Sequence, residues 1–276
     1  MTRHAFILPH QEMAVFWAPK AACSTLAEVI ALSVLDKDVI ESWDFDTGGP
    51  RALLEAQGML TTGLEAQKIA THLKYQTHAI LRDPYDRLIS AFVNKFIRKN
   101  DTAITRFADM EAFAFRFLQH NAAKLGLPHA PSHDDNWTGM TFRRFLNAIC
   151  DVIDESCEQN RLLNQHWNTQ IPEVFRAQNL NFDAVYDLKT LPNFFETLFA
   201  RTGNRVKIPA RNASSYDRGD AVDLCDVNTL EIVKMTGVSK ACFEDAALRK
   251  RVQKSFAIDY HYLNETGQGA NSTYAA

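Results

Sequence analysis

Apolar residues of this 276-residue chain follow two patterns that alternate along the sequence. The uninterrupted apolar run at 13–17 is typical of a buried strand, and the short segments at 77–81 and 182–188 are predicted to be strands as well. Between these runs apolar side chains recur every three or four residues, as they do from Leu26 to Val34, which is the period of one helix face. Strands that alternate with helices predict an α/β fold with a central, mainly parallel sheet flanked by helices.

Local capping chemistry predicts where two of the helices begin. Ser24 or Thr25 is the expected N-cap of the first helix, and Asp83 can cap a later helix that has Pro84 at its first position. A single domain is expected over residues 1–263, followed by a small, polar tail at 264–276 that we expect to be disordered. Other predicted helices lie within 51–68 and at 107–118, 141–153, 192–202, 228–235 and 244–257.

Composition and charge narrow the class of protein. Hydrophobic residues make up 46% of the chain and charged residues 23%, which excludes a disordered or collagen-like chain. The formal net charge of −3 argues against a nucleic-acid partner held by overall positive charge. No apolar stretch approaches the length of about 18 residues that a membrane span needs. The five cysteines are irregularly spaced and residues 1–13 hold no apolar signal core, so we expect a soluble, cytoplasmic protein with reduced thiols.

The segment Pro19-Lys20-Ala21-Ala22-Cys23-Ser24-Thr25, between a predicted strand and a predicted helix, has the chemistry of an anion-binding loop. Helix N-termini attract anions through unpaired N–H groups, and small side chains let the backbone approach a phosphate. Lys20 adds a charge, and Ser24 and Thr25 add hydroxyl donors. The segment lacks the glycines of the P-loop pattern, and an ordinary strand–helix turn with a solvated lysine remains an alternative.

The segment from Arg82 to Phe92 forms a second strand–loop–helix unit. Arg82 at a strand end can make a bidentate contact with a phosphate, and Ser90 lies two turns into the helix. A capped amphipathic helix with a hydrogen bond between Asp86 and Ser90 is the alternative. Both loops follow the carboxyl ends of predicted parallel strands, where open α/β sheets bind nucleotides.

Together, the motifs Pro19-Lys20-x-x-Cys23-Ser24-Thr25 and Arg82-Asp83-Pro84-Tyr85-x-Arg87-Leu88-x-Ser90-Ala91-Phe92 resemble the two cofactor motifs of sulfotransferases. The most similar branch is the carbohydrate branch, sulfotransferase family 2, which contains the chondroitin and HNK-1 enzymes. The resemblance spans residues 13–262. We expect two departures from that branch: no membrane anchor, and no counterparts of the disulfide cysteines of its Golgi members. Looser matches are His166-Trp167-x-x-Gln170, Tyr186-Asp187 and Asn212-Ala213-Ser214-Ser215.

The resemblance implies a P-loop-like fold and an enzyme that transfers a sulfuryl group. The donor would be 3′-phosphoadenosine 5′-phosphosulfate, and the acceptor a hydroxyl, expected on a carbohydrate, with no metal required. Lys20 would be catalytic, neutralising the leaving oxygen. Arg82 and Ser90 would bind the 3′-phosphate. The 5′-phosphosulfate would be bound by Lys20, Ala21, Ala22, Cys23, Ser24 and Thr25.

Two histidines compete for the role of general base. His72 precedes the strand that leads to Arg82, in a Thr-His-Leu context that is similar to the base region of cytosolic sulfotransferases, so we expect it near the donor's end of the sheet. His166 is the rival. It lies beside Trp167, in a setting suited to stacking against a sugar ring, and could instead bind or orient the acceptor. His78 lies inside a strand and is expected to be a core residue.

The sequence is also compatible with two other functions. A nucleotide-dependent phosphoryl transferase could use the same loops, but the chain lacks a Walker A lysine–serine pair and an obvious magnesium carboxylate. A non-catalytic nucleotide-binding protein with the same fold is the other alternative. The sequence identifies neither the acceptor nor the oligomeric state. A metal site at His129 and His133 is not expected, because both lie in a loop that contains prolines.

Overall fold

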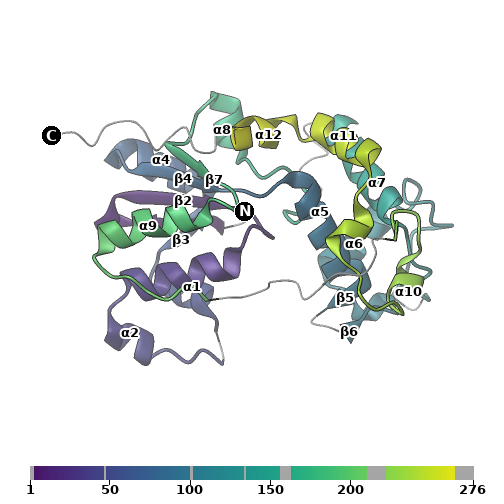
Figure 1. Cartoon of the computed structure of the whole chain (residues 1–276), viewed down its shortest axis with the longest axis horizontal. Helices are drawn as coiled ribbons and strands as arrows, with labels where there is room; N and C mark the ends of the chain where they lie inside the picture. Colours follow the sequence, from purple (N-terminus) through teal and green to yellow (C-terminus); the bar gives the residue numbers. More distant parts are fainter. Residues whose placement is uncertain are drawn as a thin grey trace. The chain divides into compact units, whose positions relative to one another are not determined.

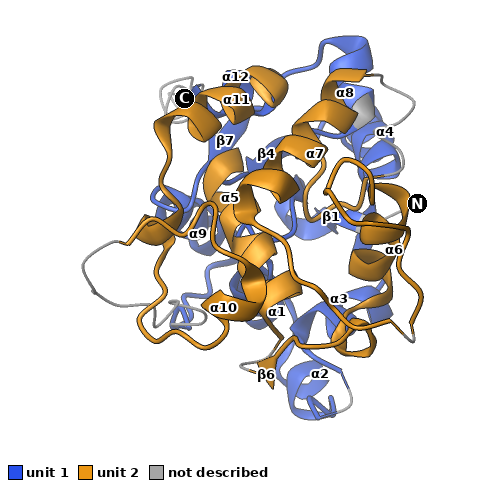
Figure 2. Cartoon of the chain, turned by 90° about the vertical axis from the view of Figure 1, so that its right-hand side faces the viewer, with its two compact units in different colours: residues 1–83, 170–213, 258–276 blue, residues 84–169, 214–257 orange. Residues whose placement is uncertain are grey.

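The computed structural model describes residues 3–46, 48–99, 102–133, 135–155, 163–209 and 222–264 (Figure 1). The chain contains two compact units, coloured separately in Figure 2. The first unit holds the described residues of 1–83, 170–213 and 258–276, and the second those of 84–169 and 214–257. The motif at 212–215, Cys157 and the tail after Asn264 lie outside the described residues.

The first unit is built on a five-stranded sheet in the order β3-β1-β2-β4-β7. Strands β2 and β4 pair in parallel, as do β4 and β7, whereas β1 is antiparallel to both β2 and β3. The expectation of a mainly parallel sheet is therefore only partly right, since the sheet is mixed. The strands are β1 (Arg3–Leu8), β2 (Met13–Trp17), β3 (Leu60–Thr62), β4 (Gln76–Ile80) and β7 (Ala184–Tyr186).

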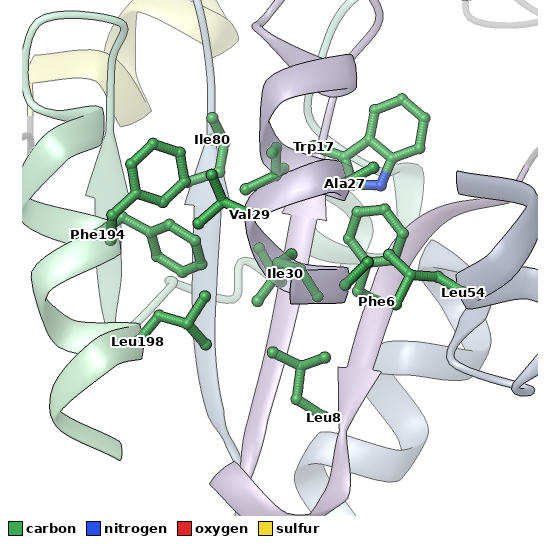
Figure 3. Close-up of a cluster of buried hydrophobic side chains, with 14 of the residues drawn as sticks. Phe6, Leu8, Trp17, Ala27, Val29, Ile30, Leu54, Ile80, Phe194 and Leu198 are labelled. Atoms are coloured by element: carbon green, nitrogen blue, oxygen red, sulfur yellow. The ribbon is translucent and has the colours of Figure 1, made fainter. Parts of the chain in front are cut away.

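Helices cover both faces of this sheet. On one face, Phe6, Leu8 and Trp17 pack against α1 (Cys23–Val34), α3 and α9 in a continuous apolar core (Figure 3). On the other face, small and aromatic side chains of β1, β2 and β4 pack against α4, α8 and α12. Both faces of β2 are buried, which explains its uninterrupted apolar run. The remaining helices of this unit are α2 (Lys37–Glu41), α3 (Pro50–Ala56), α4 (Gly63–Leu73), α8 (Glu173–Gln178), α9 (Leu191–Thr202) and α12 (Ala257–Asn264).

The second unit is mainly helical around an aromatic core. Phe92, Phe96, Phe145 and Trp167 are fully buried, with neighbouring ring centroids 5.3–6.2 Å apart. A short hairpin, β5 (Arg98–Lys99) with β6 (Thr102–Ala103), follows the π-helix η2 (Val93–Ile97). The helices are α5 (Pro84–Phe92), α6 (Ala112–His120), α7 (Phe142–Glu155), α10 (Thr229–Ile232) and α11 (Ala246–Ser255), with 3-10 turns η3 (Phe107–Asp109) and η5 (Lys240–Phe243).

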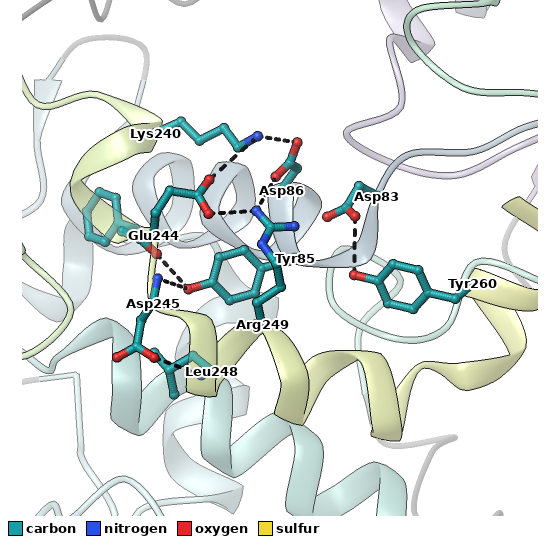
Figure 4. Close-up of polar contacts among 10 residues, drawn as sticks. Asp83, Tyr85, Asp86, Lys240, Glu244, Asp245, Leu248, Arg249 and Tyr260 are labelled. Atoms are coloured by element: carbon teal, nitrogen blue, oxygen red, sulfur yellow. Dashed lines mark hydrogen bonds and ion pairs between the residues drawn. The ribbon is translucent and has the colours of Figure 1, made fainter. Parts of the chain in front are cut away.

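Tyr85, a member of the second motif, has a structural position in this unit. Its hydroxyl donates to the carbonyl of Phe243 at 2.6 Å and accepts from the N–H of Asp245 at 3.3 Å (Figure 4). The guanidinium of Arg249 lies 4.5 Å from the centroid of the Tyr85 ring. Burial raises the pKa of the Tyr85 hydroxyl well above its usual value, so the hydroxyl keeps its proton. Its two hydrogen bonds hold α5 against the segment that leads into α11.

Among the described residues, no helix is long and apolar enough to cross a bilayer. The thiols of Cys23, Cys150, Cys225 and Cys242 are free, and burial raises the pKa of Cys150 to about 11. The last three of these cysteines are buried.

Candidate anion-binding site at the carboxyl edge of the sheet

The loop between β2 and α1 has an unusual backbone for a sequence without glycine. Lys20 and Ala22 both have positive φ angles, of 70° and 54°. A left-handed conformation costs an L-residue about 1–2 kcal/mol, and such strain is concentrated at functional sites. The turn is closed by the N–H of Ala21, which donates to the carbonyl of Ala18 at 3.1 Å. The loop therefore folds back tightly at the end of β2, where other phosphate loops use glycine.

The first turn of α1 begins without a side-chain cap. The N-cap is Ala22, which offers no side-chain cap, so the prediction of Ser24 or Thr25 as N-cap is wrong by two or three residues. Both hydroxyl residues instead lie inside the first turn, with Ser24 exposed and Thr25 buried. The first N–H groups of a helix have no intrahelical acceptor, and the macrodipole adds partial positive charge there. The anion-binding role of this loop stays a prediction.

Arg82 comes to the same edge of the sheet. In the parallel pairing of β2 with β4, Trp17 lies opposite Ile80, so the segments that follow them leave the sheet side by side. The guanidinium Nη1 of Arg82 donates to the carbonyl oxygen of Lys20 at 3.0 Å. The structure thus brings Lys20 and Arg82 together, and two cationic side chains share the carboxyl edge with the N-terminus of α1.

The backbone of Arg82 is held by a buried amide. The N–H of Arg82 donates to Oε1 of Gln170 at 2.9 Å, and Nε2 of Gln170 donates to the carbonyl of Arg82 at 2.7 Å. Gln170 is held in turn by Asp259, a carboxylate with no exposed surface, which accepts from both the backbone N–H and Nε2 of Gln170. We call Gln170 and Asp259 the Arg82 clamp. A buried network of this kind fixes one geometry, because each polar group in it needs its partner.

The role of this clamp is not evident from the sequence. Gln170 belongs there only to a loose match, and no sequence motif includes Asp259. The available signal was one carboxylate inside the apolar and aromatic segment from Phe256 to Leu263. Next to it, the hydroxyl of Tyr260 donates to Oδ2 of Asp83 at 3.2 Å (Figure 4).

The structure does not bring His72 to the loop. Thr62 ends β3 at the carboxyl edge and caps α4 by accepting from the N–H of Glu65 at 3.2 Å. Helix α4 then runs back for 11 residues, roughly 16 Å, and His72 lies exposed in its last turn, before β4 begins. His72 is therefore at the amino end of β4, while Arg82 follows its carboxyl end. The expectation that His72 lies near the donor's end of the sheet is wrong.

His78 is a core residue, as predicted. Its side chain is 2% exposed, stacks on Tyr186 at 6.0 Å between ring centroids, and lies edge-on to Phe194. Within the described residues, neither ring nitrogen has a hydrogen-bond partner. Burial and the nearby charge of Arg201 lower the pKa of His78 to about 4, so the imidazole is neutral near pH 7.

His166 and Ser90 belong to the second unit. Ser90 lies on α5 and is half-buried. His166 is half-buried, and its ring stacks on Phe113 with centroids 4.7 Å apart and planes 3° apart. Trp167 is fully buried in the aromatic core, so it cannot stack against a sugar ring as the sequence analysis expected. In the part of the chain that the structure describes, no group of three or more His, Cys, Asp or Glu side chains could hold a metal ion.

Comparisons with known proteins agree with the two motifs. Residues 3–264 match a family model described as the sulfotransferase family. Carbohydrate sulfotransferase 12 of Mus musculus is 28% identical over 150 residues, which cover 52% of this chain and 34% of that protein. The match therefore spans about a third of the length of this relative. No solved structure matches the chain.

Proposed function

We propose, because the chain belongs to the sulfotransferase family, that it transfers a sulfuryl group from 3′-phosphoadenosine 5′-phosphosulfate to a hydroxyl of a carbohydrate. The observation that carries this proposal is the hydrogen bond from Arg82 to the carbonyl of Lys20, which joins both motifs at one edge of the sheet. The carbohydrate acceptor is supported by the name of the relative from Mus musculus.

Lys20 has the central role in this proposal. The donor supplies an activated sulfuryl group whose transfer leaves negative charge on the bridging phosphate oxygen. The ammonium of Lys20 would neutralise that charge, and the first N–H groups of α1, with the hydroxyl of Ser24, would hold the 5′-phosphate. Ala22, which is half-buried, puts only a small side chain beside these N–H groups.

The 3′-phosphate would be bound by Arg82 and Ser90. Arg82 suits this role because a guanidinium can donate two parallel hydrogen bonds to one phosphate. The Arg82 clamp fixes the backbone from which that side chain extends. The role of Ser90 rests on the second motif and remains a prediction from the sequence.

His166 is the general base in this proposal, in place of His72, which lies at the amino end of β4. His166 precedes Gln170 by four positions in the chain, and Gln170 hydrogen-bonds to the backbone of Arg82. In the transfer, Nε2 of His166 would take the proton of the acceptor hydroxyl as the hydroxyl oxygen bonds to sulfur. The electron pair of the broken sulfur–oxygen bond stays on the bridging oxygen, beside Lys20.

A direct test combines binding with turnover. Calorimetry with 3′,5′-adenosine diphosphate measures occupation of the donor site, and labelled donor with a panel of carbohydrates measures transfer. We expect binding in a one-to-one ratio and label in at least one carbohydrate. Binding without transfer to any acceptor would support a non-catalytic nucleotide-binding protein instead, and absence of binding would refute the donor assignment.

A further inference from the structure

The imidazole of His166 is held by a short polar loop of the second unit. Oδ1 of Asn164 lies 3.0 Å from the backbone nitrogen of His166 and 2.6 Å from its ring atom Nδ1. One amide oxygen therefore contacts both the backbone and the ring of the same residue. Phe113 packs flat against one ring face, which limits rotation of the imidazole.

These contacts define which ring nitrogen carries the proton. A backbone N–H can only donate, so the Asn164 atom beside it is the amide oxygen and not the nitrogen. The same oxygen is an acceptor for the ring, so Nδ1 of His166 must carry hydrogen. A neutral imidazole has one N–H group, and its lone pair is then on Nε2.

A buried arginine stabilises the loop that presents both residues. Arg87 has no exposed surface. Its Nη1 donates to the carbonyl oxygens of Gln165 and His166, each at 3.1 Å, and its Nη2 donates to the carbonyl of Asn168. A buried guanidinium needs such acceptors, so Arg87 and the loop hold each other in one conformation.

We propose that Asn164 is a positioning residue that holds His166 in the Nδ1–H tautomer and so makes Nε2 the proton acceptor. This inference rests on the proposed role of His166 as the general base. Asn164 does not touch the reacting atoms in this scheme; it acts through the orientation and protonation of the imidazole.

The charged groups near His166 also affect how kcat/KM depends on pH, and they are the same in all Asn164 variants. Arg87 binds the carbonyl of His166, and Lys95 lies 5.4 Å from the centroid of the Phe113 ring. Lys95 is also paired with Glu111, with Nζ and Oε2 2.6 Å apart. Because Asn164 variants leave these three groups in place, a difference between variants reports on Asn164.

The kinetic test compares Asn164→Asp, Asn164→Leu and the control Asn168→Ala. The side chain of Asn168 accepts from the N–H of Thr169 at 2.8 Å, in the same loop. In Asn164→Asp the new carboxylate favours the protonated ring of His166. The acid limb of the plot of kcat/KM against pH should therefore move to higher pH by about one unit. Asn164→Leu should lower kcat on the order of 10-fold at unchanged donor KM, and Asn168→Ala should retain the wild-type pH profile. An unshifted limb in Asn164→Asp would overturn the proposal.

A spectroscopic test separates this inference from the proposed function. Nitrogen NMR of 15N-histidine-labelled protein, assigned by difference with His166→Gln, should show the Nδ1–H form of His166 in the wild-type chain. An Nε2–H form would overturn the role of Asn164 whatever the activity. Conversely, wild-type kcat in His166→Gln together with the Nδ1–H form would refute only the role of His166 as base. Asn164→Asp is nearly isosteric, so it remains informative if Asn164→Leu fails to fold.

Discussion

Replacing Gln170 by alanine tests the Arg82 clamp. The substitution removes both side-chain hydrogen bonds to the backbone of Arg82 and the bond from Nε2 to Asp259, while the backbone N–H of Gln170 keeps its acceptor. Gln170 is 8% exposed, so water cannot readily replace these partners. The perturbation therefore acts on the segment that carries Arg82 without altering any charge.

The magnitude follows from the number of hydrogen bonds. At about 1 kcal/mol for each of three bonds, the free energy of unfolding should fall by about 3 kcal/mol. Arg82 would also lose its fixed backbone, which forfeits part of the roughly 1.5–3 kcal/mol that a charged hydrogen bond contributes. We expect the Kd for 3′,5′-adenosine diphosphate to rise by about tenfold, equivalent to about 1.4 kcal/mol.

Urea unfolding and calorimetry measure these two effects, with Gln67→Ala as the matched control. Gln67 is 9% exposed in the same unit, and its Nε2 donates to Oγ1 of Thr71 at 2.9 Å, away from the site. We expect the control to lose only about 1 kcal/mol and to keep its Kd. Equal destabilisation of the two variants, with wild-type Kd in both, would refute the reasoning.

Three further predictions concern single side chains. His78 has a pKa of about 4 in the folded chain and about 6.5 in the unfolded chain. Between these values the unfolded chain binds one more proton, so the free energy of unfolding falls as the pH falls from about 6.5 to about 4. His78→Leu should flatten this pH dependence, measured by urea unfolding at several pH values. Arg82→Ala should weaken 3′,5′-adenosine diphosphate binding roughly 10- to 150-fold in calorimetry, and unchanged affinity would exclude it from the phosphate site. His166→Ala should lower kcat by about 10²–10⁴-fold, whereas His72→Ala should not, and the reverse result would restore His72 as base.

The strands show what the sequence could and could not predict about the fold. Strand β2 was visible as an apolar run because the sheet is covered on both faces, and β4 and β7 were predicted from shorter apolar stretches. Strand β3 has only three residues, of which one is buried, so it leaves no pattern. Strand β1 is followed by the 3-10 turn at Pro9–Gln11, which obscured a hairpin with β2. The antiparallel position of β1 depends on long-range pairing, which local periodicity does not carry.

The candidate site was predictable where it follows from sheet topology. Lys20 and Arg82 follow adjacent parallel strands. Segments that follow parallel strands lie at the carboxyl edge of the sheet, and this rule predicts the position of both residues. The same rule, applied to α4, would have placed His72 at the opposite edge, because a residue just before a strand lies at its amino end. The Arg82 clamp joins Gln170 and Asp259, which are 89 positions apart, and such a pairing depends on the folded chain.

The most direct test of the central claim is the rate of sulfuryl transfer by Lys20→Ala under single-turnover conditions with labelled donor. Lys74→Ala is the control, since Lys74 also has a positive φ angle, of 58°, but follows α4 at the amino end of β4. Both variants remove one lysine charge from a left-handed position. The account predicts a loss of about 10²–10³-fold for Lys20→Ala and the wild-type rate for Lys74→Ala. Equal rates in the two variants would contradict it.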